Sequence, residues 1–211
     1  MNEQITASGQ GETKAMPDLA ALTLTVTVQA ADQAEAVRQN AEHTRAVRAI
    51  LRETGIADKD IETQNYTVQP QYNRQKKTPT LNGYWVQNSL QVTVRELDQV
   101  GSVIDKVATN DALSVGYISF GLSNRAQAEA EALSQAVVSA QRKAGVMAAA
   151  AGVGLGRLLS MTEGTSDGFP SSAYAGGMLS SAPAAAETPI SAQQVEINAF
   201  VTLVYALEPA A

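Results

Sequence analysis

The chain has 211 residues, of which 45% are hydrophobic and 17% are charged, so its composition is that of a folded globular protein. Its net charge of −6 and its isoelectric point near 4.8 argue against nucleic acid or an anionic membrane surface as the main partner. The absence of cysteine excludes disulfides, thiolate nucleophiles, zinc–thiolate sites and thiol redox sensing.

The sequence predicts no transmembrane helix, because no apolar run reaches the ~18–20 residues of a membrane span. The opening Met1-Asn2-Glu3 is not the start of a typical signal peptide. We therefore expect either a cytosolic protein or the mature form of an exported protein whose signal peptide has been removed.

The first third of the chain predicts two strands and a helix. Residues 5–11 form a short strand, and in residues 19–28 apolar side chains alternate with Thr23, Thr25 and Thr27, which predicts a strand with one apolar and one threonine face. Asp32 and Glu35 form a capping-box variant that opens a helix ending at Gly55. The predicted buried stripe of this helix is Val37, Ala41, Thr44, Val47 and Leu51.

Residues 61–72 and 81–94 predict a hairpin with a long loop, in which Trp85 lies on the more polar face of the second strand. A shorter helix over 97–107 and a strand over 115–122 follow.

The stretch from residue 124 to 163 predicts a long alanine-rich helix, a glycine turn and a buried strand from residue 155. The predicted buried face of the helix is Ala126, Ala130, Leu133, Val137, Ala140, Ala144, Met147 and Ala151. An alanine face requires close approach of whatever packs on it, and Gly145, costing up to about 1 kcal/mol in a helix, predicts such an approach at its own position. Gly152 is expected to end the helix.

The predicted order is β-β-α-β-β-α-β-α-β-β, an α+β fold of mostly antiparallel sheets packed by three helices. We expect a single domain over residues 1–207, with a possible α-β-β-α-β sub-lobe at 32–122 and a long helix bridging the lobes. Residues 166–190 are rich in Gly, Ser, Ala and Pro and predict a flexible loop or arm. Residues 208–211 form a tail.

Catalytic and ligand-binding patterns are weak. His43 is the only histidine, and we interpret it as a solvated helix residue because no partners for a triad or metal site can be placed around it. Asp58 and Asp60 could serve acid–base chemistry or bind calcium, but a polar turn is the preferred interpretation. The glycines at 152, 154 and 156 follow a helix and open a strand, which is the reverse of a dinucleotide fingerprint. We predict no catalytic, cofactor or metal residues.

Three features predict contact surfaces: the threonine stripe of Thr23, Thr25 and Thr27, the aromatic Trp85, and the apolar residues Tyr174, Met178 and Leu179 in the long loop. An ordinary solvated sheet face, a partly covered aromatic and loop anchoring are the alternative interpretations. We favour self-association, because an exposed sheet face and a long arm both serve it.

The chain resembles the SIMPL domain family, formerly a domain of unknown function, over nearly its whole length. The resemblance rests on weak motifs in the right order: Gly9-x-Gly11, Pro17-Asp18-x-Ala20, Gly55-Ile56, Asp60-Ile61-x-Thr63, Pro70-x-Tyr72, Gly83-Tyr84, Lys143-Ala144, Ala148 to Gly152, Leu155-Gly156, Glu163, Pro189 and Val195-Glu196-Ile197-x-Ala199.

This resemblance implies an α/β fold, export to the periplasm of a Gram-negative cell or association with its outer membrane, homo-oligomers in some members and a link to oxidative-stress tolerance in others. It supplies no catalytic residues. We therefore expect a non-enzymatic, homo-oligomeric envelope protein without cofactors. The alternative is a periplasmic module that binds a small molecule or peptide between two lobes, and an unrecognised hydrolase ranks last.

Overall fold

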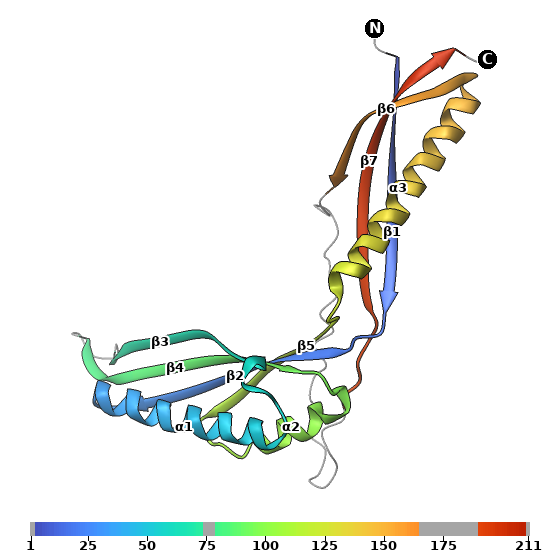
Figure 1. Ribbon diagram of the computed structural model, residues 1–211. Coiled ribbons are helices and arrows are strands. Elements are labelled where there is room, and N and C mark those ends of the chain that lie inside the picture. The colour runs from blue at the N-terminus through green and yellow to red at the C-terminus, as the bar shows by residue number, and fades with distance from the viewer. Residues whose placement is uncertain (1–2, 74–78, 165–189, 210–211) are drawn as a thin grey trace. The chain divides into compact units, whose positions relative to one another are not determined.

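The computed structural model describes residues 3–73, 79–164 and 190–209. The fold is α+β, and the order of its elements is the predicted one (Figure 1). The elements are β1 (Gln4–Ala15), β2 (Leu19–Ala30), α1 (Gln33–Glu53), β3 (Ile61–Asn73), β4 (Thr80–Val94), α2 (Val100–Val107), β5 (Leu113–Gly121), α3 (Arg125–Ala150), β6 (Val153–Gly164) and β7 (Val195–Pro209). Single turns of 3-10 helix, Asp58–Asp60 and Leu97–Gln99, precede β3 and α2.

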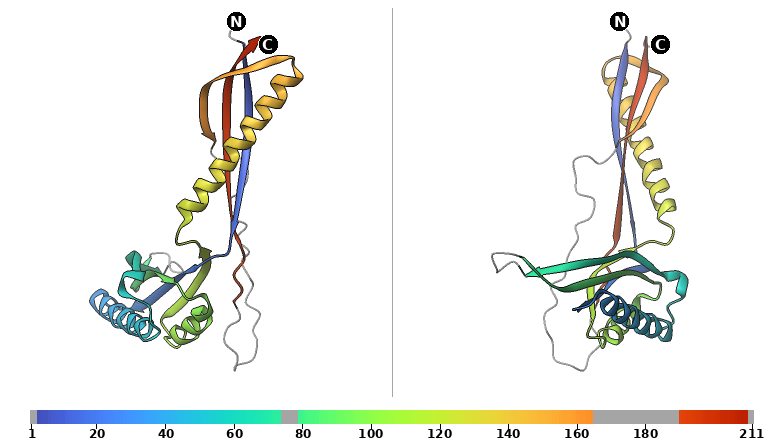
Figure 2. Two further views of the ribbon diagram at one scale, coloured as in Figure 1. Left: turned by 45° about the vertical axis from the view of Figure 1, so that its right-hand side comes forward. Right: turned by 90° about the vertical axis from the view of Figure 1, so that its left-hand side faces the viewer.

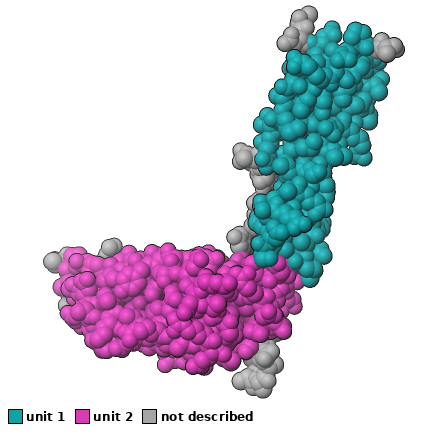
Figure 3. All heavy atoms as spheres, viewed as in Figure 1, with its two compact units in different colours: residues 1–16, 122–177, 194–211 teal, residues 17–121, 178–193 magenta. Residues whose placement is uncertain are grey.

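The chain divides into two compact units, which Figure 3 colours separately. Unit 1 contains β1, α3, β6 and β7, and so takes its strands from both ends of the chain. Unit 2 contains β2 to β5 together with α1 and α2, within the continuous segment Pro17–Gly121. Each unit has a hydrophobic core of its own.

Unit 2 is a four-stranded antiparallel sheet in the order β3-β4-β2-β5, with α1 and α2 packed on one face (Figures 1 and 2). Along β2 and β4, every second side chain points into the core between the sheet and the helices. The largest fully buried side chains of this core are Leu22, Leu24, Val26, Leu90, Val92, Val94, Val47, Leu51, Val100 and Val103.

The predicted ends of α1 are confirmed. Asp32 caps the helix, with its Oδ1 accepting from the Glu35 backbone N–H at 3.0 Å, and Gly55 takes a left-handed φ of 88° just beyond the end. The predicted stripe is partly wrong: α1 buries Ala36, Asn40, Thr44, Val47 and Leu51. Asn40 is fully buried, whereas Ala41 beside it is exposed.

Unit 1 is a three-stranded antiparallel sheet in the order β1-β7-β6, with α3 across one face. The helix meets β1 where the strand has Gly9 and Gly11, and a Cβ on Gly11 would lie only 2.6 Å from the Ala136 backbone nitrogen. The predicted close approach is therefore real. The helix presents alanine at every fourth position to the sheet: Ala128, Ala132, Ala136, Ala140, Ala144 and Ala148.

The predicted face of α3 is partly wrong: Ala140 and Ala144 are buried and Leu133 and Val137 pack against the core, but Ala126, Ala130 and Ala151 are exposed. Leu133 and Val137 are partly buried beside the alanine row, and Met147 is 47% exposed. A row of i, i+4 positions is inclined by about 26° to the helix axis, so the contact line runs obliquely along the helix. Figure 2 shows α3 crossing the strands of its sheet at an angle. Against strand glycines only alanine fits on that line, and the larger apolar residues lie to its sides.

Two further expectations about this region are wrong. A Cβ on Gly145 would meet nothing within 4 Å, so the close approach occurs at the glycines of β1 and not in the helix. Strand β6 is not buried but forms an edge of the sheet, and its residues from Arg157 to Gly164 are exposed. The predicted stop at Gly152 is confirmed by its φ of 71°, with β6 starting at the next residue.

Candidate interaction surfaces

The sheet of unit 2 has a second face, opposite α1 and α2, that is built from amides and hydroxyls. The antiparallel register places its residues in rows across three strands: Thr67, Gln87 and Thr27 in one row, and Asn65, Ser89 and Thr25 in the next. We call this the amide–hydroxyl face. It comprises Thr23, Thr25, Thr27 and Gln29 of β2, Trp85, Gln87, Ser89, Gln91 and Thr93 of β4, Glu62, Asn65, Thr67, Gln69 and Gln71 of β3, and Ser114 and Ser119 of β5.

Side chains on this face hydrogen-bond to one another. Thr25 Oγ1 and Ser89 Oγ lie 3.2 Å apart across β2 and β4, and the Ser114 hydroxyl donates to the Thr25 carbonyl at 3.3 Å. Gln64, at a bulge of β3, donates to Gln91 Oε1. These contacts hold the polar groups in fixed positions, while each amide and hydroxyl keeps further donor or acceptor capacity.

Trp85 lies at one end of the amide–hydroxyl face, between Gln29 on β2 and Gln69 on β3. Its side chain is partly buried. Glu62 is the one charged residue of the face as defined, although 17% of the whole chain is charged.

The structure brings together four of the predicted contact residues. Thr23, Thr25, Thr27 and Trp85 share the amide–hydroxyl face, although the stripe and the tryptophan were found separately in the sequence. Their role as a contact surface stays a prediction. Tyr174, Met178 and Leu179 lie outside the described residues, as does nearly all of the predicted arm at 166–190.

In unit 1, side chains of α3 bond to the backbone of the edge strand β1. Gln135 Oε1 accepts from the Glu12 backbone N–H at 3.4 Å, and Lys143 Nζ donates to the Ser8 carbonyl at 2.8 Å. Such contacts occupy backbone groups that would otherwise be open to another strand. The β1 edge is thus partly protected.

The opposite edge, β6, exposes large apolar side chains. Leu158 is 40% exposed, Leu159 is 39% exposed and Met161 is 51% exposed. By register, Leu158 pairs with Tyr205 and Met161 with Leu203, two core residues of β7, so the sheet continues the apolar pattern outward to an edge strand whose apolar side chains are exposed. An exposed apolar edge strand is a typical site for pairing with another chain.

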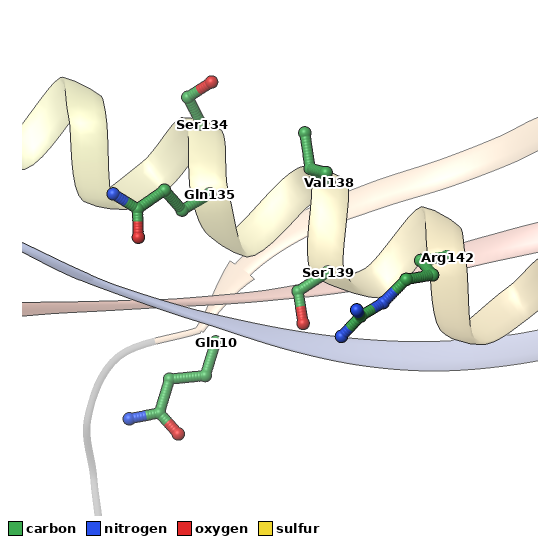
Figure 4. Close-up of a pocket in the computed structure, with 6 residues that line it drawn as sticks. All are labelled: Gln10, Ser134, Gln135, Val138, Ser139 and Arg142. Carbon is green, nitrogen blue, oxygen red and sulfur yellow. The ribbon is translucent and has the colours of Figure 1, made fainter.

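Two hollows of about 420 and 430 Å³ lie on the outer surface of α3. One is lined by Arg142, Lys143, Val146 and Met147, all from the helix itself. The other is lined by Gln10 of β1 and by residues of α3 that include Ser139 and Arg142, and the Gln10 side chain points away from the helix (Figure 4). Residues of a single helix cannot enclose a ligand, and the second hollow adds one strand residue, so both are surface depressions.

The residues considered for chemistry are held by other side chains. His43 is partly buried and not fully solvated, with its Nδ1 lying 3.1 Å from Asn110 Oδ1. Arg52 Nε donates to Asp58 at 2.7 Å, and Arg95 donates to Asp60 at 2.8 Å. The Arg52 guanidinium lowers the pKa of the Asp58 carboxyl below its ordinary value.

Within the described ranges, no group of three or more His, Cys, Asp or Glu residues is placed to hold a metal ion. None of the helices in the described part of the chain combines the length and the apolarity that a membrane span requires.

A buried polar network, which the sequence did not reveal, ties α1 to the sheet of unit 2. The Asn40 amide donates to the carbonyls of Val26 and Val86 at 3.0 and 3.4 Å, and the Asn88 amide donates to Thr44 Oγ1 at 3.2 Å. Asn40 is a polar member of a row of helix positions at steps of four and three, which are Ala36, Asn40, Thr44, Val47 and Leu51. That spacing was the signal that could have found it. The network fixes the position of α1 over β2 and β4.

Comparison with known proteins gives a consistent result. The model of the SIMPL family, described as a protein of unknown function (DUF541), matches residues 5–205. The 26 kDa periplasmic immunogenic protein of Brucella melitensis biotype 1 is 34% identical, over 97% of this chain and 85% of its own length. The uncharacterized protein YggE of Escherichia coli K12 is 28% identical, over 97% of this chain and 83% of its own. This protein belongs to the SIMPL family.

Proposed function

We propose that this protein is an exported, non-enzymatic component of the bacterial periplasm that works as a homo-oligomer. The periplasmic location is supported by the name of the Brucella relatives. The absence of enzymatic activity is supported by His43, Asp58 and Asp60, each of which is engaged by another side chain. A link to envelope or oxidative-stress tolerance would be indirect, because the chain has no cysteine for thiol chemistry.

The main support for self-assembly is the exposed apolar edge strand β6. In an isolated chain, Leu158, Leu159 and Met161 would present apolar side chains to water on a strand whose outer edge pairs with no other strand of the described residues. A strand from a second copy would cover the side chains and supply the missing backbone partners. The contacts of α3 with Glu12 and Ser8 make β1 the less favourable edge for such pairing.

The test is size-exclusion chromatography with light scattering at tens of micromolar protein. We expect the parent chain to form an oligomer and Met161→Lys to shift it toward the monomer, because a charge at the contact would have to be desolvated. Leu81→Lys is the matched control, since Leu81 is also 51% exposed but lies on β4 in unit 2. A strictly monomeric parent, or equal effects of the two variants, would contradict the proposal.

A further inference from the structure

The amide–hydroxyl face of unit 2 has a composition that is unusual for a solvated sheet face. Exposed sheet faces and edges usually carry Lys, Glu and Arg, which keep a protein soluble. Apart from Glu62 at one end, the residues of this face are threonine, serine, glutamine and asparagine around Trp85, with Ala21 and the exposed Tyr117 beside them toward β5. In contrast, α1 of the same unit displays Glu35, Arg38 and Glu42 in a surface ion-pair cluster.

This composition selects for an uncharged ligand rich in hydroxyl groups. Each amide and each hydroxyl both donates and accepts, so rows such as Thr67, Gln87 and Thr27 can match a chain of hydroxyls in either orientation. The face has no arginine or lysine to neutralise phosphates, which argues against nucleic acid. Glu62 lies at the end of the face and would repel an anionic polymer.

A protein partner fits this face less well than a glycan does. Cores of protein interfaces are enriched in aromatic residues, Met and Arg, and serine and threonine rarely carry binding energy there. The amide–hydroxyl face has mostly the opposite composition, with Trp85 at one end and Tyr117 at the β5 side as its aromatic residues. The apolar groups suited to a protein partner lie in unit 1, at Leu158, Leu159 and Met161.

Trp85 supplies a flat aromatic surface for stacking, which the hydrogen-bonding side chains of the face do not. The face of an indole ring carries negative potential, which attracts the weakly positive C–H groups on the flat side of a sugar ring. Gln29 and Gln69 on the flanking strands and Gln87 on the same face of β4 surround it. The register thus puts three amide side chains next to Trp85, and amides both donate to and accept from hydroxyls.

We propose that the amide–hydroxyl face binds an extended, uncharged glycan strand, with Trp85 stacking on one sugar ring and the rows of Gln, Thr, Ser and Asn bonding the sugars beyond it. This site is independent of the self-association proposed through β6. Two neutral, hydroxyl-rich hexamers, cellohexaose and the hexamer of N-acetylglucosamine, distinguish the kind of glycan, because only the second carries acetamido groups.

The test uses the fact that Trp85 is the only tryptophan of the chain. The full-length protein is titrated with cellohexaose and with the hexamer of N-acetylglucosamine while tryptophan emission is recorded. We expect a saturable change of emission with at least one of them at low-millimolar glycan, and none with an oligogalacturonate of the same length. No saturable change with either neutral hexamer, or an equal response to the anionic one, would overturn the proposal.

Two variants locate the site. Gln87→Glu and Gln69→Glu introduce a charge among the amides and should each weaken binding at least tenfold, and both residues reach solvent, so the fold should tolerate the change. Gln141→Glu on the exposed side of α3 is the matched control and should bind like the parent. Circular dichroism checks that each variant is folded. Equal affinity of all three variants would overturn the proposal.

A second measurement separates this proposal from self-association. Acrylamide quenching of Trp85 is recorded without glycan over a dilution series of the protein. If a second copy covered the amide–hydroxyl face, quenching would weaken as the protein concentration rises, and the proposal would fail even if the oligomer exists. Constant quenching in the oligomer supports a face that remains open to a glycan.

Discussion

Glycine at positions 9 and 11 of β1 is expected to be essential for the packing of unit 1. An added methyl group on Gly11 would lie 2.6 Å from the Ala136 nitrogen and 2.8 Å from Gln135 Cβ, and closer still to the Ala132 carbonyl oxygen. Ordinary contact begins near 3.4 Å, so α3 and β1 would have to separate by about 0.8 Å or more. Two of these three obstacles, the Ala136 nitrogen and the Ala132 oxygen, are backbone atoms, which cannot move aside as a flexible side chain does.

We expect Gly11→Ala and Gly9→Ala each to lower the free energy of unfolding by about 3 kcal/mol, the upper part of the range for overpacked sites. The matched control is Gly145→Ala within α3, where an added Cβ meets nothing within 4 Å. That change should raise stability by about 0.5–1 kcal/mol, because alanine loses less conformational freedom in a helix than glycine does. The same chemical change is thus predicted to have opposite signs at the β1 glycines that contact α3 and at a helix glycine that meets no neighbour.

The assay is urea unfolding followed by circular dichroism, to which α3 contributes as the longest of the described helices with 26 residues. The shift of the midpoint at constant slope gives the change in stability. Gly11→Ala and Gly9→Ala variants within about 0.5 kcal/mol of the parent, the usual range for neutral surface changes, would refute the close packing of α3 on β1.

Two further predictions concern unit 2. Asn40→Ala should lower the free energy of unfolding by about 2–3 kcal/mol, because it removes the donor that satisfies two buried carbonyls. Asn40→Asp should be more harmful at pH 7 than at pH 4, because an ionised carboxylate would face those carbonyl oxygens. Urea unfolding at both pH values checks this. Arg52 lowers the pKa of Asp58, and Arg38 and then Gln39 lower the pKa of Glu35. The stabilisation that these carboxylates give is therefore full above their ordinary pKa values of 3.8 and 4.5 and is lost as the pH falls through the lower folded-state values. The stability difference between the parent and Asp58→Asn, measured from pH 7 to 2, should shrink in that window and also in high salt.

Periodicity in the sequence was sufficient for the order of elements but not for the faces of the long helices. The alternation of Leu22, Leu24 and Val26 with threonines predicted β2 correctly, because a strand has only two faces. For α3, choosing the most apolar residues put Met147 inside, whereas distance to the glycines of β1 decides which residues are buried. That distance depends on which strand the helix meets, and no local pattern encodes it.

The contact surfaces show the same division. Thr25 and Trp85 were found on separate strands by composition alone, but only the register of β2 with β4 places them on one face. The strand that follows α3, β6, was expected to be buried. It is instead an edge, since β7, from the end of the chain, takes the central position between β1 and β6. Pairing over such a sequence separation cannot be deduced from neighbouring residues.

The last prediction follows from how the two units are threaded. The core of unit 2 comes from residues 17–121, with Ile190 as a partly buried addition from elsewhere in the chain. A fragment of residues 17–121 should therefore fold alone and lose about 1 kcal/mol for the missing Ile190, roughly half the value of a fully buried side chain. Trp85 reports on this unit, so its emission should follow nearly the same urea transition in the fragment and in the full chain, and in the full chain that transition should be unaffected by Gly11→Ala. A fragment without dispersed amide resonances, or a Trp85 transition that moves with Gly11→Ala, would mean that the units fold as one cooperative body, because a two-state transition shared by both is what coupled units give.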